Sequence, residues 1–343
     1  MLTHRNLIYN MEATIETFPH DENTTLVGFL PFFHSFGHMA TLWMVLCLGL
    51  RGIYHPNPLE PKIIGGLIEK YKGTIMIGTS TFLQSFIRRC TAEQMKSLSF
   101  VVCGAEKLSP RVRDAFSEKF GVEPLEGYGT TECAPAVSVN VPDQVSPGFY
   151  ARGTERGTIG RLLPGQASKV FDPDTGVELG IGQPGLLCIK GPNIMKGYLN
   201  QPEKTAKVLK DGWYETGDIA ALNIEGFITI TDRLARFSKI AGEMVPHTKV
   251  EEVLHQLLNL TDQAMAIASV PDQQKGERLV VLHTLSDEEL ATLVGRLDQS
   301  GLPNLWVPRP NAFYRVDAIP VLGTGKMDIK SVKKLALALD LGE

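Results

Sequence analysis

The sequence predicts an α/β protein in which a parallel-sheet part and a β-rich subdomain precede a small α+β C-terminal domain. Helical and strand patterns alternate up to about residue 125, which is typical of a parallel sheet with helices on its faces. From about residue 158 the helical patterns stop, and short strand patterns are punctuated by Gly and Pro. A mixed pattern of helices and strands follows. The predicted domains are therefore 1–157, 158–231 and 232–343.

The first part alternates helix and strand in order. Thr3 can cap a helix that runs to about residue 17, and a short apolar strand at 26–30 ends at Pro31. The same patterns predict helices at 36–50, 61–71, 79–90 and 110–120, and strands at 74–78, 100–103 and 122–125. Ligands of such sheets bind at the carboxyl ends of the strands, so the loops after these strands are the candidate site.

The remaining elements follow from the same patterns. In the β-rich subdomain we predict strands at 185–190 and 227–230, and no helix. In the C-terminal domain we predict helices at 247–258, 287–299 and 329–339, and strands at 264–270 and 279–284.

Composition excludes several classes of protein. Of the 343 residues, 43% are hydrophobic and 21% are charged, the balance of a folded globular chain. The net charge of -4 provides no global attraction for nucleic acid, so we expect no nucleic-acid partner. The five cysteines never form a CxxC pair, which argues against a zinc site and a disulfide framework. With an apolar run at 39–50 too short to span a bilayer and no signal region, we expect a cytoplasmic protein.

Three segments have the residue types of a nucleotide site. EGYGTTE at 126–132 follows a predicted strand and places an aromatic ring, two hydroxyls and a carboxylate between glycines; a plain structural turn is the alternative. GWYETGD at 212–218 places Asp218 just before a predicted strand, where a carboxylate can accept from both ribose hydroxyls; a turn aspartate is the alternative. PVLGTGK at 320–326 places Lys326 on a glycine loop, as a point charge for phosphate or carboxylate oxygens or as a solvated loop lysine.

Together and in this order, the three segments resemble the adenylate-forming superfamily, whose motifs read YGxTE, TGD, DR or GR, and PxxxxGK. LPFFHSFG at 30–37, GAE at 104–106 and DR at 232–233 match in the same order, and the resemblance covers essentially all 343 residues. FFHSFG, GTSTFL at 78–83, GYGTTECAP at 127–135, GPNIM at 191–195 and KIAGEMV at 239–245 are most similar to the acyl-[acyl-carrier-protein] synthetase half of bacterial 2-acylglycerophosphoethanolamine acyltransferase/acyl-carrier-protein synthetases. The resemblance implies a partial large adenylation domain followed by a mobile C-terminal domain.

The resemblance also implies two half-reactions with ATP and Mg²⁺ as cofactors. A fatty acid carboxylate attacks the α-phosphate of ATP and expels pyrophosphate. The phosphopantetheine thiol of an acyl carrier protein then attacks the acyl-adenylate, and the thioester serves phospholipid acylation. Coenzyme A as the acceptor, or a non-catalytic nucleotide- or acyl-binding remnant, are the alternatives.

Four residues would act on the reacting groups, as the resemblance implies. Lys326 would bridge the carboxylate and the α-phosphate, and Thr131 would donate to the α-phosphate. Glu132 would hold Mg²⁺, whose other partners are mostly phosphate oxygens and water. His34 would gate the acyl pocket beside the carboxylate, although a neutral core histidine is the alternative.

Six residues would hold the nucleotide. An aromatic ring and a backbone segment would sandwich the adenine, a carboxylate would accept from both ribose hydroxyls, and a guanidinium would contact the ribose. In that order these are Tyr128, the segment Gly104, Ala105 and Glu106, then Asp218 and Arg233.

Two more residues would form the thiol side of the site. Gly242 suits a close approach of backbone to pantetheine. Lys239 matches the same segment, and a plain surface lysine is its alternative. An acidic carrier protein would meet exposed cations after residue 232, for which Arg233, Arg236 and Lys239 are the candidates.

The resemblance fails in three places. The Ser/Thr/Gly-rich phosphate loop should precede THRN at 3–6, where the chain has only Met1 and Leu2. The HxxxxD signature of the acyltransferase does not occur, and Ala235 stands where relatives often have a charged hinge residue. We therefore expect an incomplete piece of a longer protein, whose other half would carry a lysophospholipid acyltransferase domain and could bring the chain to the inner face of the bacterial cell membrane.

Overall fold

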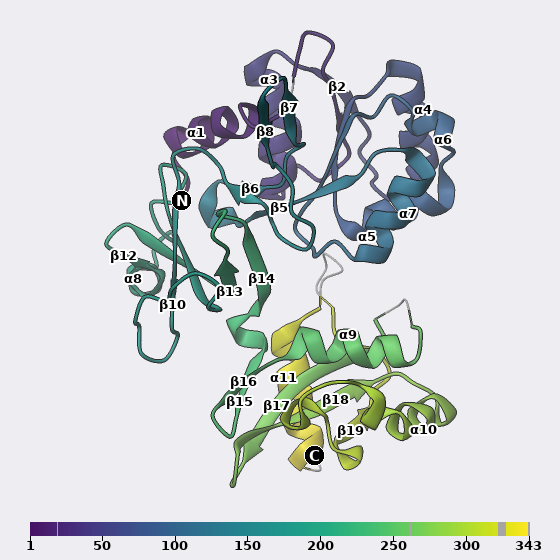
Figure 1. The fold of residues 1–343 in the computed structure, drawn as a ribbon, viewed down its shortest axis with the longest axis vertical. Coiled ribbons are helices and arrows are strands. Elements are labelled where there is room, and N and C mark those ends of the chain that lie inside the picture. Colours follow the sequence, from purple (N-terminus) through teal and green to yellow (C-terminus); the bar gives the residue numbers. More distant parts are fainter. Residues whose placement is uncertain (19, 261–262, 322–326, 342–343) are drawn as a thin grey trace. The chain divides into compact units, whose positions relative to one another are not determined.

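The computed structural model describes the chain except residues 19, 261–262, 322–326 and 342–343 and the side chain of Ala235. The chain divides into two compact units, and Figure 1 shows the fold of each. The N-terminal unit comprises Met1–Thr216 and Ala220–Ile230, and the C-terminal unit comprises Gly217–Ile219 and Thr231–Glu343. The predicted division into 1–157, 158–231 and 232–343 stays a prediction.

A seven-stranded sheet forms the centre of the N-terminal unit. Its order is β2 (Arg51–Tyr54), β1 (Thr25–Gly28), β3 (Ile75–Gly78), β4 (Phe100–Cys103), β5 (Pro124–Gly129), β6 (Ala136–Val139) and β9 (Arg161–Leu162). The first five strands are parallel, and β6 and β9 join antiparallel. The predicted fold class is confirmed. Because parallel strands end at the same edge, the loops after β1, β3, β4 and β5 share one edge.

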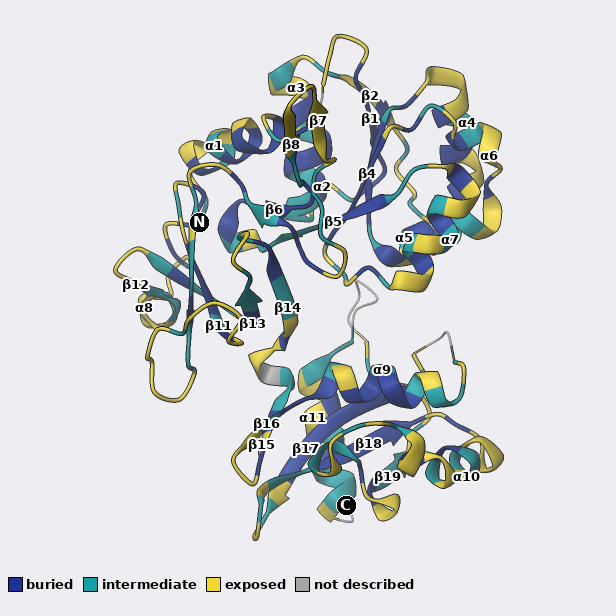
Figure 2. Ribbon diagram, in the orientation of Figure 1, coloured by how far each residue is buried: buried dark blue, intermediate teal, exposed yellow. Residues whose placement is uncertain are grey.

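Helices cover both faces of this sheet (Figure 1). On one side lie α4 (Pro61–Tyr71), α5 (Ser80–Arg89), α6 (Ala92–Met95) and α7 (Pro110–Phe120). On the other lie α1 (His4–Ile15), α2 (Ser35–Gly37), the π-helix η1 (His38–Trp43) and α3 (Met44–Leu48). Strands β1, β3 and β4 are buried along their whole length between these layers (Figure 2), as expected for a covered parallel sheet.

The β-rich part of the N-terminal unit contains a second sheet. It consists of β10 (Ala167–Phe171), β11 (Gly185–Lys190), β12 (Leu209–Lys210), β13 (Trp213–Leu222) and β14 (Ile228–Arg233), and β7 (Gln144–Ser146) and β8 (Phe149–Ala151) form a separate hairpin. The prediction that this stretch has no helix is wrong, because α8 (Pro202–Val208) lies in it with Pro202 at its start, where proline's fixed φ suits a helix. Asp218 lies within β13 and not before a strand.

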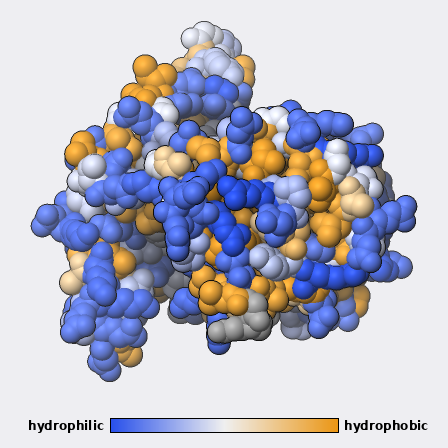
Figure 3. All heavy atoms as spheres, turned by 90° about the horizontal axis from the view of Figure 1, so that it is seen from below, coloured by the Kyte–Doolittle hydropathy of each residue, from blue (hydrophilic) through white to orange (hydrophobic). Residues whose placement is uncertain are grey.

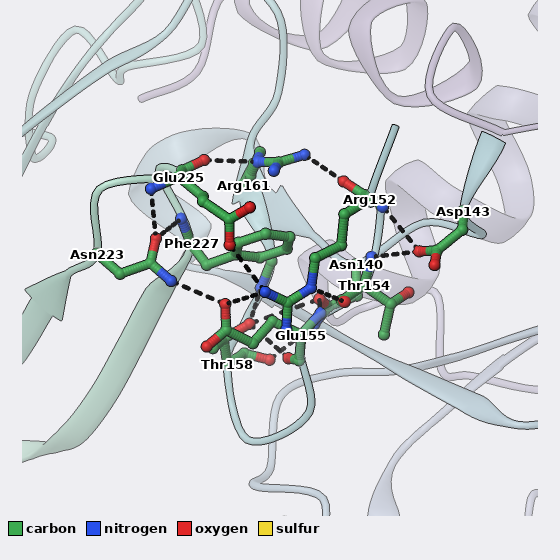
Figure 4. A network of polar contacts seen from close by, with 12 residues as sticks. Asn140, Asp143, Arg152, Thr154, Glu155, Thr158, Arg161, Asn223, Glu225 and Phe227 are labelled. Carbon is green, nitrogen blue, oxygen red and sulfur yellow. Dashed lines mark hydrogen bonds and ion pairs between the residues drawn. The ribbon is translucent and has the colours of Figure 1, made fainter. Parts of the chain in front are cut away.

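A polar network around Phe227 ties the connection after β6 to the turn before β14 (Figure 4). Arg152 Nη1 donates to Glu225 Oε2 at 2.8 Å, and Arg161 Nε donates to the Glu225 carbonyl at 2.7 Å. Both guanidinium groups lie over the Phe227 ring, at 5.3 and 4.1 Å from its centre. Asn223 Nδ2 donates to Glu155 Oε2 at 2.8 Å. Side chains from distant segments thus fix this connection.

The C-terminal unit is a five-stranded sheet with helices on its two faces. The strands are β15 (Phe237–Ile240), β16 (Glu243–Pro246), β17 (Met265–Asp272), β18 (Gly276–His283) and β19 (Phe313–Arg315), and the helices are α9 (His247–Leu257), α10 (Asp287–Gly295) and α11 (Ile329–Leu341). Ile267 packs in a core with α9 and α10, whereas its neighbour Ala268 packs in a core with α11. This alternation follows from the two-residue period of a strand.

Short 3-10 turns complete the described chain: η2 (Thr131–Cys133), η3 (Leu234–Arg236), η4 (Leu297–Gln299), η5 (Asn304–Trp306) and η6 (Pro310–Ala312). None of the helices described is both long and apolar enough to cross a bilayer. The face drawn in Figure 3 is mostly hydrophilic, with hydrophobic side chains visible between the hydrophilic ones.

Candidate functional site

The candidate site of the N-terminal unit is the group of loops that follow the parallel strands. His34 lies in the loop after β1, the segment 104–106 after β4, and Thr131 and Glu132 in η2 after β5, while Tyr128 lies in β5 itself. We call these loops the strand-end cluster. Ser35 Oγ lies 3.0 Å from Thr131 Oγ1, so the loops after β1 and β5 are in direct contact.

The acidic side chain of segment 104–106 is engaged by another loop of the N-terminal unit. Glu106 Oε2 accepts hydrogen bonds from the backbone N–H of Thr81 at 3.1 Å and from its Oγ1 at 2.9 Å. Ala105 has a φ of 66°, and a Cβ on Gly104 would lie 3.1 Å from the ring of Phe36. The contacts suit the predicted role of this segment, in which its backbone and not its carboxylate meets the adenine.

Two fully buried asparagines hold the loop that carries Thr131 and Glu132. Asn10 Nδ2 donates to the Ala136 carbonyl at 2.7 Å, and Asn10 Oδ1 accepts from the Ala136 N–H at 3.0 Å. Asn193 Nδ2 donates to the Cys133 carbonyl at 3.0 Å. A buried hydrogen bond of this kind is costly to leave unmade, so these bonds restrain the loop.

The carboxylate of Glu132 has a partner that the sequence analysis missed. Tyr198 Oη donates to Glu132 Oε1 at 2.8 Å, and the Glu132 carbonyl accepts from the Met195 N–H at 2.8 Å. Burial raises the pKa of Tyr198 to about 12, and the hydrogen bond to Glu132 acts in the same direction, so the phenol stays a donor near neutral pH. The only available signal was position, because Tyr198 closely follows the GPNIM motif at 191–195.

The oxygen ligands of the strand-end cluster fit a magnesium ion carried by a nucleotide. Mg²⁺ is usually held by one or two carboxylates together with substrate phosphates and waters, and here Glu132 supplies a carboxylate on a fixed loop. Among the residues that the structure describes, no group of three or more His, Cys, Asp or Glu could hold a metal ion by itself. A magnesium ion held by Glu132 would take its other ligands from phosphate oxygens and waters.

His34 is not a fully buried core histidine. It lies half-buried at the N-cap of α2, where its Nδ1 accepts a hydrogen bond from the Phe36 N–H at 3.2 Å. The neighbouring Phe33 is 88% exposed. The alternative of a core histidine is therefore not supported, and a gating role stays a prediction.

The two residues predicted to hold the ribose lie together in the C-terminal unit. Asp218 is buried, and Arg233 Nε lies 3.4 Å from its Oδ1. Asp232 fixes the start of this segment, because its Oδ1 accepts from the Arg233 N–H and its Oδ2 from the Thr248 N–H, both at 2.8 Å. Lys326 lies outside the described residues.

The predicted thiol-side residues lie on the hairpin of β15 and β16. Lys239 is exposed on β15, and its backbone N–H donates to Glu277 Oε2 at 2.6 Å. Ala241 and Gly242 form the two-residue turn with φ of 50° and 90°. A turn with two positive φ values is the hairpin type that favours glycine, so the turn alone explains Gly242.

Arg236 is not an exposed cation, so the prediction that it is one of the exposed cations after residue 232 is wrong. Its guanidinium pairs with the carboxylate of Glu251, and only 14% of its side chain is exposed. Glu251 is itself buried and accepts from the Ile267 N–H at 2.7 Å through Oε1. A buried carboxylate needs a positive partner, which explains why this arginine turns inward.

Comparison with known proteins gives a consistent result. Residues 1–199 match the family described as "AMP-binding enzyme". The chain is 33% identical over 341 residues to "Probable 4-coumarate--CoA ligase 1" of Dictyostelium discoideum, covering 97% of this chain and 60% of that protein. It is 32% identical over 340 residues to "Long-chain-fatty-acid--CoA ligase" of Escherichia coli O6:H1, covering 95% and 57%.

A solved structure agrees with these relatives. The ATP-bound MatB of Rhodopseudomonas palustris superimposes with a TM-score of 0.84 at 25% identity, over 100% of this chain and 66% of that one. The chain thus spans about 60% of the length of the curated relatives it matches.

Proposed function

The chain belongs to the AMP-binding enzyme family, and on this premise we propose that it is part of a ligase that activates a carboxylic acid with ATP and transfers it to a thiol. Enzymes of this family use ATP and Mg²⁺. The carboxylate attacks the α-phosphate, the bond to pyrophosphate breaks, and an acyl-adenylate forms. A thiol then attacks the acyl carbon and AMP leaves.

We propose a fatty acid as the acid and coenzyme A as the first choice of acceptor. Two relatives at 32–33% identity are named CoA ligases, one of them for long-chain fatty acids, which supports this alternative over transfer to a carrier protein. An acyl carrier protein remains the second candidate. It rests on the KIAGEMV segment and on exposed Arg233 and Lys239, which would attract an acidic partner.

The observation that carries the proposal is the rigid loop bearing Thr131 and Glu132 at the strand ends. Transfer to the α-phosphate brings two anions together, so positioned donors and cations contribute most to the rate. We propose that Thr131 donates to the α-phosphate and that Glu132 holds the magnesium of the ATP complex, which neutralises phosphate charge. Lys326 would bridge the carboxylate and the phosphate.

The remaining proposed roles concern the adenine, the ribose, the acyl group and the thiol. The backbone of segment 104–106 and the ring of Tyr128 would hold the adenine, and Asp218 would accept from the ribose hydroxyls beside Arg233. His34 would lie next to the acyl group. Gly242 and Lys239 would serve the thiol.

Fatty-acid-dependent exchange of pyrophosphate into ATP tests the first half-reaction, with this chain and with a longer chain that contains it. Thioester formation from supplied acyl-adenylate then compares coenzyme A with an acyl carrier protein. From the longer chain we expect pyrophosphate exchange that requires fatty acid and is lost in Lys326→Ala. In the second assay we expect faster transfer to coenzyme A than to the acyl carrier protein. Absence of exchange from the longer chain would contradict a ligase, and faster transfer to carrier protein would favour the second candidate.

A further inference from the structure

The hydroxyl of Tyr198 donates to Oε1 of Glu132 at 2.8 Å, although 66 residues separate the two. We propose that Tyr198 is a positioning residue that holds one carboxylate oxygen of Glu132 so that the other is presented to the magnesium of bound ATP. This inference rests on the function proposed above. It adds a residue outside the nucleotide-binding and catalytic residues predicted from the sequence.

The contact is part of a fixed arrangement. The Tyr198 N–H donates to Thr205 Oγ1 at 2.9 Å, and Lys204 Nζ lies over the tyrosine ring at 4.3 Å from its centre. Gly197, with a φ of 144°, brings the chain so close that an added Cβ would lie 2.8 Å from Thr205 Cγ2. The phenol is therefore held in place before any ligand arrives.

Glu132 is tied to the same segment at two points. Its carbonyl accepts from the Met195 N–H at 2.8 Å, and its Oε1 accepts from Tyr198. The hydrogen bond from Tyr198 is made to Oε1, so in the arrangement we propose Oε2 is the oxygen that meets the cation. A carboxylate with one oxygen held loses rotational freedom before it binds a cation, so it gives up less entropy on binding.

A simpler explanation is that the hydrogen bond only satisfies a half-buried phenol. The two explanations differ in how the metal affects ATP binding. A positioning role changes the contribution of the metal to ATP affinity, whereas a role in folding or packing changes ATP affinity equally with and without metal.

The experiment measures the dissociation constant of ATP by equilibrium dialysis with and without Mn²⁺, for the full 343-residue chain. The dissociation constant without Mn²⁺ divided by the dissociation constant with Mn²⁺ gives the contribution of the metal to ATP affinity. In Tyr198→Phe we expect this ratio to fall by about 10-fold, since partners of metal ligands typically contribute 10–100-fold to metal affinity. Glu132→Gln should lower the ratio further, and Tyr198→Phe should change nothing in the Glu132→Gln background.

Tyr150→Phe is the matched control. Tyr150 Oη donates to Asp143 Oδ2 at 2.7 Å on the β7–β8 hairpin, so this variant loses the same type of bond outside the strand-end cluster. Its ratio should equal that of the unchanged chain. Thermal unfolding of each variant confirms that it folds.

Three results would overturn the inference. An unchanged ratio in Tyr198→Phe, with a lowered ratio in Glu132→Gln, would reject the role of Tyr198 and leave the proposed function intact. A full effect of Tyr198→Phe in the Glu132→Gln background would show that the tyrosine does not act through Glu132. If the unchanged chain bound ATP no better with Mn²⁺ than without, the inference would fail, whereas the proposed function would still be decided by pyrophosphate exchange in the longer chain.

Discussion

Ser35 Oγ and Thr131 Oγ1 lie 3.0 Å apart, although the two residues are 96 positions apart in the chain. Ser35 begins α2 in the loop after β1, and Thr131 begins η2 after β5. The order of the parallel strands thus brings a serine of the FFHSFG segment to the hydroxyl that we propose for the α-phosphate. Either hydroxyl can donate in this contact, and when Ser35 donates, the proton of Thr131 is left to donate to the phosphate.

We therefore predict that Ser35→Ala lowers the rate of acyl-adenylate formation. A hydrogen bond worth about 1 kcal/mol corresponds to about 5-fold in rate. The measurement is pyrophosphate exchange at saturating ATP in the longer chain. Ser117→Ala is the control, because it removes a similar hydroxyl bond, to the Arg113 carbonyl at 2.8 Å, on α7. Equal rates for Ser35→Ala and the unchanged chain would contradict a role in orienting Thr131.

The pair formed by Arg236 and Glu251 leads to a prediction about stability. Removing Arg236 leaves the buried Glu251 without its guanidinium partner, at a cost of about 3–5 kcal/mol, whereas removing Glu251 leaves Arg236 with Asp232 at 3.9 Å. Arg236→Leu should destabilise the C-terminal unit by about this amount, and Glu251→Leu by less, because Asp232 still faces the guanidinium. The double variant should lose less than the sum, because the Arg236–Glu251 pair is then removed as a whole and only Asp232 loses a more distant partner. Urea unfolding monitored by circular dichroism measures these free energies, and simple additivity would refute the prediction.

Elements with strong local signals are predictable from the sequence alone. The helices 61–71 and 110–120 have the predicted bounds, because Pro61 and Pro110 stand at their first turn, where proline's fixed φ suits a helix. Strand 100–103 is also confirmed, as a short apolar run that is buried along its whole length.

Elements without such signals were missed. In β2 only Ile53 is buried, as the strand lies at the sheet edge, so its sequence lacks an apolar pattern. Strands β15 and β16 mix exposed and buried positions in only four residues each. The predicted helix at 36–50 is helical, but it includes the π-helical turn of η1.

The candidate site also contains some residues that could be predicted from the sequence and others that could not. Motif order placed His34, segment 104–106, Thr131 and Glu132 on loops that the parallel sheet brings to one edge. The contact of Tyr198 with Glu132 depends on how distant segments pack, and no local pattern reports it. The burial of Arg236 likewise depends on a tertiary contact, its pairing with Glu251. Its charge alone therefore predicted, wrongly, that it lies at the surface.

The buried His247 predicts how the stability of the C-terminal unit depends on pH. Burial, with smaller contributions from Arg236 and Lys333, lowers its pKa from 6.5 to about 3, and Ser238 Oγ lies 2.5 Å from its Nε2. The folded unit thus keeps this imidazole neutral, whereas the unfolded chain takes up a proton below about pH 6.5. Its contribution to stability is complete above that pH and is lost as the pH falls toward 3.

We expect this residue to add a slope of about 1.4 kcal/mol per pH unit between pH 6 and 4. His255 and His283 add to the slope, because burial lowers their pKa as well. His247→Gln should therefore reduce the slope without abolishing it, in urea unfolding curves taken at each pH. His4→Gln, an exposed change in the other unit, is the control. An unaltered slope in His247→Gln would exclude this histidine as a source.

Substitutions at Gly242 separate its role in the turn from its proposed role toward the thiol. With a φ of 90°, Gly242→Ala should destabilise the C-terminal unit by about 1–2 kcal/mol. Gly295→Ala, at the end of α10, should instead be neutral or slightly stabilising, because alanine is the better helix former. Asparagine tolerates positive φ, so Gly242→Asn should recover much of the stability.

Thiol transfer should respond differently from stability. A Cβ on Gly242 meets no atom within 4 Å among the described residues, so the side chain of Gly242→Asn would stand in the space where pantetheine is proposed to approach. We expect the KM for the thiol to rise several-fold in Gly242→Asn despite its recovered stability, when transfer from supplied acyl-adenylate is measured in the longer chain. A KM that recovers together with stability would assign Gly242 to the hairpin turn alone.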